Sequence, residues 1–406
     1  MGGPLAGITV IEWAMFQNGP GAAYILGDLG AEVIKIEQPG VGDAGRGLVA
    51  LYGDSMSLPG GRLVTFETAN RNKKSITVNL RHEKGREVLF RLVRKADVFL
   101  TNFSPAVAKR CNADWTTLQK VNPRLIYGIA SGFGSNGPDT NKRAFDTVAQ
   151  AYSGLMHAMG DEDSPEPVQA VGAIIDQAAA SMLAFGITAA LFARYQTGKG
   201  QKVETSMLGS SIHLQALAVN MALWQGRALR RHSRRRPPNP MGNFYQCADG
   251  KWLLLGEPQS DRFWGEFCEA IGRPDLKENP RFDSVRKRRA NTELVSILDA
   301  LFATKERDEW VHAFEQKQCR FVYSPILSME EVGVLPQAIL NRYLVDFEHP
   351  EMGRVKTIGF PIDFSETSCE IRNPAPQFGQ HTEEVLSEMA GYTWEEIVQL
   401  KDVGAI

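Results

Sequence analysis

The feature that most constrains the fold is an alternation of strand-like and helix-like segments through the first third of the chain. Short runs rich in β-branched residues alternate with segments in which apolar residues recur at helical spacing. The expected strands cover residues 8–13, 31–37, 74–80, 97–103 and 124–132, and the expected helices cover residues 20–30 and 82–96. Repeated β-α-β units predict an α/β fold with a mostly parallel sheet covered by helices, which is a Rossmann-like architecture.

A sheet of this kind also predicts where a small molecule binds. Ligands of open parallel sheets bind beyond the carboxyl ends of the strands. Three loops follow expected strands at residues 16–21, 101–104 and 130–134. We therefore expect the chemistry of the protein to take place at these loops.

The length of 406 residues exceeds the size at which one hydrophobic core usually stops growing, so we expect two domains. A basic, proline-rich segment at residues 227–243 is typical of a connector. The expected organisation is a large domain at 1–205, a linker at 206–240, a small α+β domain at 241–320, a return linker at 321–370 and C-terminal helices at 371–406.

The composition argues against nucleic acid and membrane partners. The net charge of −2 provides no general attraction to nucleic acid or to an anionic membrane. The arginines between residues 227 and 236 lack interleaved aromatic residues, which favours a solvated connector over a nucleic-acid arm. The longest apolar run, residues 178–193, is shorter than the roughly 20 residues that a bilayer requires. We therefore expect it to form a core or interface helix.

The cysteines and histidines indicate neither disulfides nor a metal site. The five cysteines are scattered and include no C-x-x-C pair, which predicts free thiols in a reducing cytoplasm. The histidines lack metal-ligand spacing, so we expect no metal. The N-terminal stretch MGGPLAGITVIEW lacks a basic region followed by a long apolar run, so we expect no secretory signal.

One carboxylate, Asp176, stands at the start of a long and nearly uncharged helix-like segment at residues 173–200. An Asp at a helix N-terminus often accepts hydrogen bonds from free backbone N–H groups, and the partial positive charge of the first turn favours it there. The same position would keep a carboxylate ionised and pointed out of the end of a buried helix, as a nucleophile requires. The segment by itself favours the capping role and leaves the nucleophile open.

The glycines after the first expected strand suggest a dinucleotide site as an alternative. The stretch QNGPGAAY supplies Gly19 and Gly21 of a G-x-G-x-x-G pattern, but Tyr24 stands at the third glycine position. Glu37 ends the second expected strand, where a dinucleotide site has a ribose-binding acid. The incomplete pattern favours a tight turn that requires glycine and makes an NAD-dependent oxidoreductase the least favoured activity.

Several blocks of sequence occur in order and evenly spread: PLAGITVIEW, GAAYILGDLGAEVIKIEQPGVGD, NRNKKSITVNLRHEKGREVLFRLVRKADVFLTNFSP and YQTGKGQKVETSM. Together they resemble the class III CoA-transferase (CaiB–BaiF-like) family, which includes formyl-CoA transferase and the alpha-methylacyl-CoA racemases. The resemblance runs from residue 4 to about 210 and resumes at NPMGNFYQCADGKW and QFGQHTEEVL. It implies a Rossmann-like large domain, a small domain, a C-terminal tail that returns to the large domain, and two interlocked chains.

The resemblance also implies roles for individual residues. Asp176, within GAIIDQAAA, would be the nucleophile that attacks a thioester carbonyl, and the reaction would proceed through a mixed anhydride and an aspartyl-CoA thioester. Gln17 and Asp146 would support the reaction beside it. The residues implied to bind CoA are Asn18, Arg81, Asn102, Phe103, Arg110 and Arg143. The chain departs from the family at Gln38, where an arginine is frequent.

The expected activity is therefore the transfer of CoA from an acyl-CoA donor, with succinyl-CoA as one candidate, to a carboxylic acid. CoA thioester would be the substrate, with no permanently bound cofactor. The racemase branch of the family has a His–Asp pair, but the block KRAFDTVAQAYSG has Phe145 in place of the histidine. Because Phe cannot transfer a proton, this favours a transferase over a racemase. Intramolecular CoA transfer, an isomerase activity, stays open, as do a homodimer and a heteromer with a related subunit.

Overall fold

The computed structural model describes residues 2–406 and separates the chain into two compact units. The larger unit consists of the residues up to Met156, Gln169–Gln225 and Gln337–Ile406. The smaller unit consists of His157–Val168 and Gly226–Pro336.

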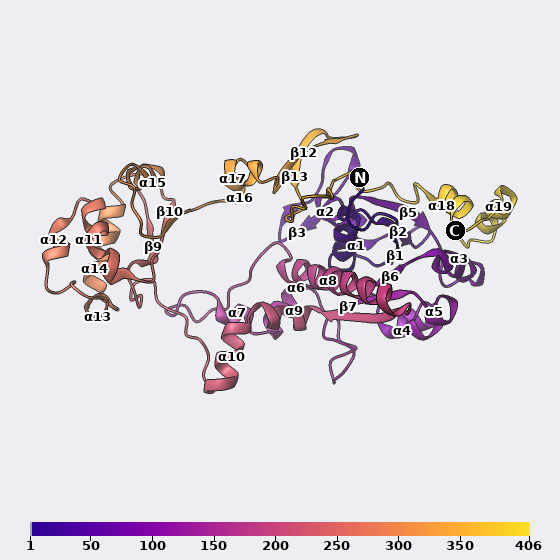
Figure 1. Cartoon of the computed structure of the whole chain (residues 1–406), viewed down its shortest axis with the longest axis horizontal. Coiled ribbons are helices and arrows are strands. Elements are labelled where there is room, and N and C mark those ends of the chain that lie inside the picture. Colours follow the sequence, from indigo (N-terminus) through magenta and orange to yellow (C-terminus); the bar gives the residue numbers. More distant parts are fainter. Residues whose placement is uncertain (1) are drawn as a thin grey trace. The chain divides into compact units, whose positions relative to one another are not determined.

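The larger unit is built on a parallel six-stranded sheet with the order β5-β2-β1-β6-β7-β8 (Figure 1). Its strands are β1 (Thr9–Trp13), β2 (Glu32–Glu37), β5 (Lys73–Thr77), β6 (Val98–Thr101), β7 (Ile126–Ser131) and β8 (Gln201–Ser206). The five strands expected in the first third of the chain are all present, so the Rossmann-like prediction is confirmed. The direction in which strands are added reverses between β1 and β6, because the chain first builds β2 and β5 on one side and then returns to the other.

Helices cover both faces of this sheet. The helices on one face are α1 (Asn18–Asp28) and α8 (Ile174–Thr197), and those on the other are α3 (Glu83–Lys95), α5 (Trp115–Val121), α18 (Thr382–Glu388) and α19 (Trp394–Asp402). Successive strand residues alternate between the two cores: Val10 packs with α1 and α8, whereas Ile11 packs with α3. Burial on both faces explains why the central strands β1, β6 and β7 are mostly apolar, whereas β2, β5 and β8 also contain charged and polar residues.

The C-terminal segment protects the edge strand β5. The backbone N–H of His381 donates to the carbonyl of Ser75 at 2.9 Å, and the N–H of Thr77 donates to Thr382 Oγ1 at 3.0 Å. Leu386 of α18 and Leu400 of α19 are buried in the core formed with α3. Figure 1 shows α18 beside β5. The expected return of the tail to the large domain is therefore present, and it covers a strand edge that would otherwise be open to pairing.

The other elements of the larger unit are short or peripheral. They are β3 (Ala50–Leu51), β4 (Asp54–Ser55), α2 (Val64–Asn70), α4 (Pro105–Arg110), α6 (Asp146–Tyr152), α7 (Leu155–Ala158), α9 (Met207–Leu214), α10 (Ala216–Gln225), α17 (Pro336–Leu340), β12 (Leu344–His349) and β13 (Gly353–Ile358), with α7 and α17 reaching its boundaries with the smaller unit. The strands β12 and β13 form an antiparallel hairpin.

The smaller unit is an α+β domain with its own core. Its antiparallel sheet has the order β11-β10-β9, from β9 (Gly242–Gln246), β10 (Trp252–Gly256) and β11 (Tyr323–Ile326). Its helices are α11 (Ser260–Ala270), α12 (Pro274–Glu278), α13 (Val285–Arg288), α14 (Thr292–Phe302), α15 (Arg307–Gln316) and α16 (Met329–Val332).

The structure draws the unit boundaries differently from the sequence. The expected linker at 206–240 begins with α9 and α10, which belong to the larger unit; Ser206 accepts a hydrogen bond from the N–H of Gly209 and so caps α9. The expected return linker at 321–370 begins with β11, which pairs with β10 in the smaller unit. Residues 157–168, expected within the large domain, belong to the smaller unit. These segments are short, and their pairing depends on distant residues.

One helix, α8, is long and apolar enough to cross a membrane by length and composition alone. Ala180, Leu183 and Ile187 on one side of it are buried against the sheet. Phe185, Phe192 and Tyr195 are exposed. Because its buried side is part of the core of the larger unit, α8 has the role of a core helix, as expected from the sequence.

Shortening Leu386 tests the contribution of the C-terminal segment. We expect Leu386→Ala to lower the free energy of unfolding by about 2–5 kcal/mol, because it removes a fully buried side chain and leaves a cavity. Val398→Ala in α19, at a position 40% exposed, is the control and should change it by less than about 1 kcal/mol. Chemical denaturation measures both values. Equal losses in the two variants would contradict this packing.

Candidate active site

The loops that follow β1 and β6 meet where the strand order reverses, and Asn102 joins them. Its Oδ1 accepts a hydrogen bond from the N–H of Met15 at 3.1 Å. Its Nδ2 donates to the carbonyl of Met15 at 2.7 Å and to Asn18 Oδ1 at 3.0 Å. The neighbouring Phe103 packs against Trp13 with ring centroids 4.3 Å apart. The first and second of the expected ligand loops thus form one connected structure at the carboxyl edge of the sheet.

The residue before Gln17 has an unusual backbone. Phe16 has a φ of 64°, in the left-handed region that non-glycine residues rarely adopt. Its N–H donates to Asp43 Oδ1 at 3.1 Å. Gln17, the N-cap residue of α1, donates from Nε2 to the carbonyl of Thr65 at 3.2 Å. Sequence reasoning missed Asp43 and Thr65, because only the fold brings them beside this loop.

The start of α8 is capped by a residue from another helix. Its N-cap residue is Ala173, which has a left-handed φ of 54° and no side chain that could accept a hydrogen bond. Instead, Asp146 of α6 accepts hydrogen bonds through Oδ2 from the N–H groups of Ile175, at 2.7 Å, and Asp176, at 3.1 Å. Gln150 donates to its other oxygen. The capping role proposed for Asp176 is therefore wrong, because Asp146 performs it.

The carboxylate of Asp176 is consequently left free. Within residues 2–406, its side chain makes no hydrogen bond or ion pair, and it is partly buried. Burial, and secondarily the negative charge of Asp146, raise the pKa of Asp176 to about 7. The expectation that the helix N-terminus helps to keep this group ionised at neutral pH is therefore corrected, because burial and Asp146 raise its pKa. Near neutral pH the carboxylate is close to its titration midpoint.

Contacts between α1, α8 and α6 bring these loops together. A Cβ atom on Gly21 would lie 2.8 Å from the Cβ of Ala180, so the glycine permits α1 to approach α8 closely. The ring of Phe16 packs edge-on against that of Phe145, which precedes Asp146, at 6.1 Å between centroids. These contacts bring the start of α1 near α8 and Phe16 against the residue that precedes Asp146. Gly21 therefore serves helix packing, whereas a Cβ on Gly19 would lie 2.7 Å from the Cβ of Ala14 in the loop after β1.

The remaining expected CoA-binding residues lie in two places. The guanidinium of Arg143 is 6.0 Å from the ring centroid of Phe145, the residue that precedes Asp146. Arg81 and Arg110 are both exposed. Each lies close enough to Cys111 for its positive charge to oppose the rise in pKa that burial causes in that thiol, so the two arginines lie in the same region of the protein. In the part of the chain that the structure describes, no hydrogen bond, ion pair or ring contact joins Arg81 or Arg110 to Asp176.

Glu37 does not have the surroundings of a ribose-binding acid. It is buried and accepts hydrogen bonds from Arg46 Nε at 2.8 Å, from Ser75 Oγ at 2.6 Å and from the N–H of Asp43 at 2.9 Å. Because these groups already occupy both oxygens, the interpretation of Glu37 as part of a dinucleotide site is wrong.

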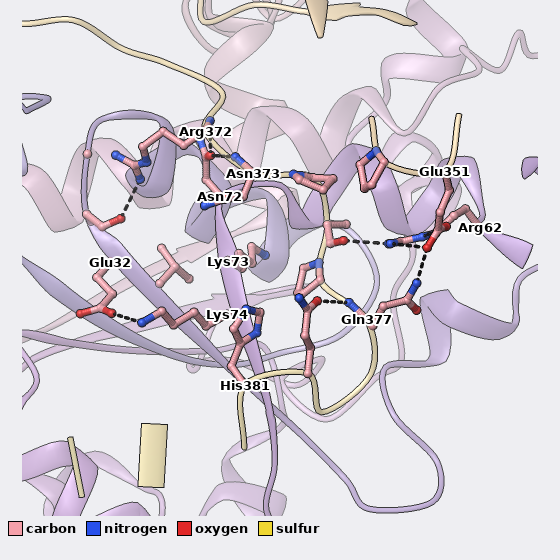
Figure 2. Close-up of a pocket in the computed structure, with 18 residues that line it drawn as sticks. Glu32, Arg62, Asn72, Lys73, Lys74, Glu351, Arg372, Asn373, Gln377 and His381 are labelled. Atoms are coloured by element: carbon pink, nitrogen blue, oxygen red, sulfur yellow. Dashed lines mark hydrogen bonds and ion pairs between the residues drawn. The ribbon is translucent and has the colours of Figure 1, made fainter. Parts of the chain in front are cut away.

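A cavity of about 560 Å³ lies at the opposite edge of the sheet, between the starts of β2 and β5 and residues 372–381 (Figure 2). Its cations already have partners: Lys74 Nζ lies 2.9 Å from Glu32 Oε1, and Arg62 Nε lies 2.6 Å from Glu351 Oε2. Ligands of such sheets bind at the carboxyl ends of the strands, and this cavity lies at the other ends. We therefore interpret it as a gap left where residues 372–381 pack against the sheet, and not as a ligand site.

Removing the charge of Asp176 should stabilise the protein in a pH-dependent way. Its pKa is raised in the folded protein from an ordinary value of 3.8, so the ionisation of Asp176 costs stability, and this cost grows as the pH rises from about 4 to 7 and is fully present above 7. We expect Asp176→Asn to raise the free energy of unfolding at pH 8 by on the order of 1–3 kcal/mol, and by much less at pH 4. The exposed Asp402→Asn is the control. A difference between wild type and Asp176→Asn that is independent of pH would contradict the raised pKa.

Comparison with known proteins shows the family to which the chain belongs. The sequence model of CoA-transferase family III matches residues 5–382. The chain is 31% identical to the succinyl-CoA:glutarate CoA-transferase of Homo sapiens, over 99% of this chain and 90% of that protein. It is also 31% identical to the formyl-CoA:oxalate CoA-transferase of Escherichia coli O157:H7, over the full length of both. The crystal structure of a CAIB/BAIF family protein from Brucella suis superimposes with a TM-score of 0.83 and 26% identity, covering 96% of this chain and 100% of that one. The chain is therefore a member of CoA-transferase family III.

Proposed function

We propose that this transferase moves CoA between two carboxylic acids with Asp176 as the nucleophile. The observation that carries the proposal is that Asp176 stands in the first turn of α8 while Asp146 accepts hydrogen bonds from two N–H groups of that turn. A carboxylate freed from capping can attack, whereas one that accepts backbone hydrogen bonds is a weaker nucleophile.

The proposed reaction has four steps that balance. Asp176 attacks the thioester carbonyl of the donor, and CoA leaves as a thiolate, which gives a mixed anhydride. The thiolate then attacks the aspartyl carbonyl, releases the donor acid and leaves an aspartyl-CoA thioester. The acceptor carboxylate attacks this thioester, which gives a second anhydride and the thiolate. Finally the thiolate attacks the acceptor carbonyl, which releases the new acyl-CoA and restores the carboxylate.

The raised pKa of Asp176 suits this sequence of steps. A carboxylate that burial has deprived of water is more reactive than a fully hydrated one, and it is still substantially ionised near neutral pH. The side-chain amide of Gln17 donates to the carbonyl of Thr65, and the neighbouring Phe16 packs against Phe145, so we assign Gln17 to the reacting carbonyl. We assign Asp146 to holding the first turn of α8 in place.

The expected CoA-binding residues form the rest of the proposal. Asn18 and Asn102 lie next to each other at the start of α1, where the thioester end of CoA would enter. Arg81 and Arg110 lie together and are exposed, which suits the phosphates of the nucleotide end. Phe103 and Arg143 would bind between these two ends, and coenzyme A would enter only as a substrate thioester.

The substrates that we propose are small carboxylic acids, with succinyl-CoA as a candidate donor. Glutarate and oxalate, which occur in the names of the relatives, are dicarboxylic acids. A screen of acyl-CoA donors against mono- and dicarboxylic acceptors would identify the pair. Racemisation is less well supported, because Phe145 has no proton to exchange. Exchange of the substrate α-hydrogen with deuterium, without exchange between acids, would favour the racemase.

Trapping tests the nucleophile directly. Incubation with an acyl-CoA followed by hydroxylamine should convert Asp176 to a hydroxamate, because anhydrides and thioesters react with amines and free carboxylates do not. Peptide mass spectrometry locates the product. Asp176→Ala should abolish the label and lower kcat by at least about 10³-fold, with an unchanged circular dichroism spectrum. Turnover like that of wild type in Asp176→Ala would remove Asp176 from the mechanism.

We also propose that two copies of the chain, or this chain and a related subunit, associate through a face of the larger unit. Large apolar side chains are exposed along α8 and α10 of that unit, at Phe185, Phe192, Tyr195, Leu217, Leu223 and Trp224. None of the residues of α10 is buried. Exposed apolar patches of this kind mark interaction sites. The five free cysteines fit the reducing cytoplasm as the place where the enzyme works.

Sedimentation tests the association. We expect wild type to sediment as a dimer and Trp224→Asp to have a larger fraction of monomer, because a carboxylate would be buried in an apolar interface. Trp394→Asp is the control, since Trp394 is similarly exposed on α19, outside the proposed face. A wild-type chain that sediments as a monomer, or equal effects of the two substitutions, would contradict the proposal.

A further inference from the structure

Four charged side chains are buried together in the larger unit, on the side of the sheet covered by α1. Lys35 Nζ lies 2.8 Å from Glu12 Oε1 and 2.7 Å from Asp43 Oδ2, and Lys73 Nζ lies 2.7 Å from Glu12 Oε2. The side chains are at most 1% exposed. We call Glu12, Lys35, Asp43 and Lys73 the buried quartet. With two positive and two negative groups, it is neutral as a whole; Lys73 is labelled in Figure 2.

Burying four charged side chains in a protein core costs free energy, because the charges lose their contact with water. Burial opposes charge on Lys35 and on Asp43. The carboxylates of Glu12 and Asp43 outweigh it at Lys35 and raise the pKa of that ammonium, and Lys35 outweighs it at Asp43 and lowers the pKa of that carboxyl. Buried ion pairs are often no more stabilising than apolar residues of the same volume. Stability alone therefore does not account for four charges beneath one loop, and their other contacts indicate what they do.

Three members of the quartet bind the backbone around Gln17. Lys35 Nζ donates to the carbonyl of Ala14 at 2.9 Å, and Lys73 Nζ donates to the carbonyl of Pro20 at 2.9 Å. Between them, Asp43 Oδ1 accepts from the N–H of Phe16 at 3.1 Å. The quartet thus binds the chain before, at and after the left-handed residue that sets the direction of Gln17.

A second route runs from Asp43 to the side chain of Gln17. Asp43 Oδ1 also accepts from the N–H of Gly45 at 2.8 Å, which fixes the turn that starts there. The carbonyl of Gly45 accepts from Thr65 Oγ1 at 3.3 Å, and the carbonyl of Thr65 accepts from Gln17 Nε2 at 3.2 Å. One carboxylate therefore supports both the backbone and the amide of Gln17.

We propose that the buried quartet is a positioning device for the transfer reaction, and that Asp43 is the positioning residue that holds Phe16 and Gln17 against the site of Asp176. The inference rests on the proposed function, because it takes Gln17 to act at the reacting carbonyl. Strained backbone persists only where its surroundings over-determine it, and the quartet provides those surroundings.

The test compares Asp43 with Asp28, an equally buried aspartate at the other end of α1. Asp28 Oδ2 pairs with Arg71 Nη2 at 2.5 Å, far along the helix from Gln17. We expect Asp43→Ala to lower kcat at least about tenfold with a smaller change in KM, while Asp28→Ala keeps kcat within about twofold at temperatures where both are folded. Asp43→Asn, which retains an acceptor oxygen for Phe16, should lose less than Asp43→Ala, and it replaces the alanine variant if that one fails to fold.

A double-mutant cycle separates positioning from general damage. If Asp43 acts through Gln17, then Asp43→Ala should change kcat by less than about threefold in a Gln17→Ala background. Effects that multiply independently would overturn the proposal, as would a kcat of Asp43→Ala and Asp43→Asn within twofold of wild type.

Amide hydrogen exchange gives a readout that does not depend on activity. In Asp43→Ala, the amides of residues 15–19 should exchange at least about tenfold faster while those of residues 22–28 stay protected, and Asp28→Ala should not accelerate residues 15–19. Unchanged exchange at residues 15–19 in Asp43→Ala would overturn the positioning role. Faster exchange there, in a protein that shows no CoA transfer, would support positioning and contradict only the proposed function.

Discussion

The site depends on two hydrogen bonds that cross between helices, from the first turn of α8 to the carboxylate of Asp146 in α6. A helix of 24 residues begins here with an alanine that cannot cap it, and a buried aspartate 27 residues earlier in the chain supplies the acceptor. Because Asp146 accepts hydrogen bonds from these two N–H groups, the carboxylate of Asp176 is not needed to cap the helix. The same arrangement places two acids close together, and burial with this repulsion raises the pKa of Asp176.

The loop on the other side of the site is held in a similar way. Phe16 and Ala173 both have left-handed backbones, and each stands just before a helix whose first turn contributes to the site. A buried aspartate binds the backbone next to each of them: Asp43 at Phe16, and Asp146 just after Ala173. Strain of this kind is common where a protein orients reacting groups, and it persists because the buried partners oppose relaxation.

The parts of the fold that sequence predicted are those set by local pattern. The strands of the parallel sheet contain short runs of β-branched residues, and α3 and α8 have clear helical composition, so their positions were found within a few residues. The helices α9 and α10 and the strand β11 were missed, because short segments are defined by partners that lie far away in the sequence. The buried quartet could not be predicted from sequence either, because its members come from three different strands and a loop that only the fold brings together.

The candidate site shows the same division. Resemblance led to Asp176, Asp146 and Gln17. The fold joins Asp146 to the first turn of α8 by hydrogen bonds and packs Phe16, the neighbour of Gln17, against Phe145. The sequence alone favoured Asp176 as a cap, because a cap supplied by another helix leaves no local signal. Nor could sequence predict its pKa, which depends on burial and on the distance to a second acid.

The central claim is that Asp176 forms a covalent bond with the acyl group, and oxygen exchange tests it most directly. In the proposed steps each turnover gives one oxygen of Asp176 to the departing donor acid and replaces it with one from the acceptor. After many turnovers with an acceptor labelled with ¹⁸O in its carboxylate, mass spectrometry of the peptide that contains Asp176 should show ¹⁸O in its carboxylate. An enzyme that turns over fully while this peptide keeps its natural isotope pattern would contradict the account.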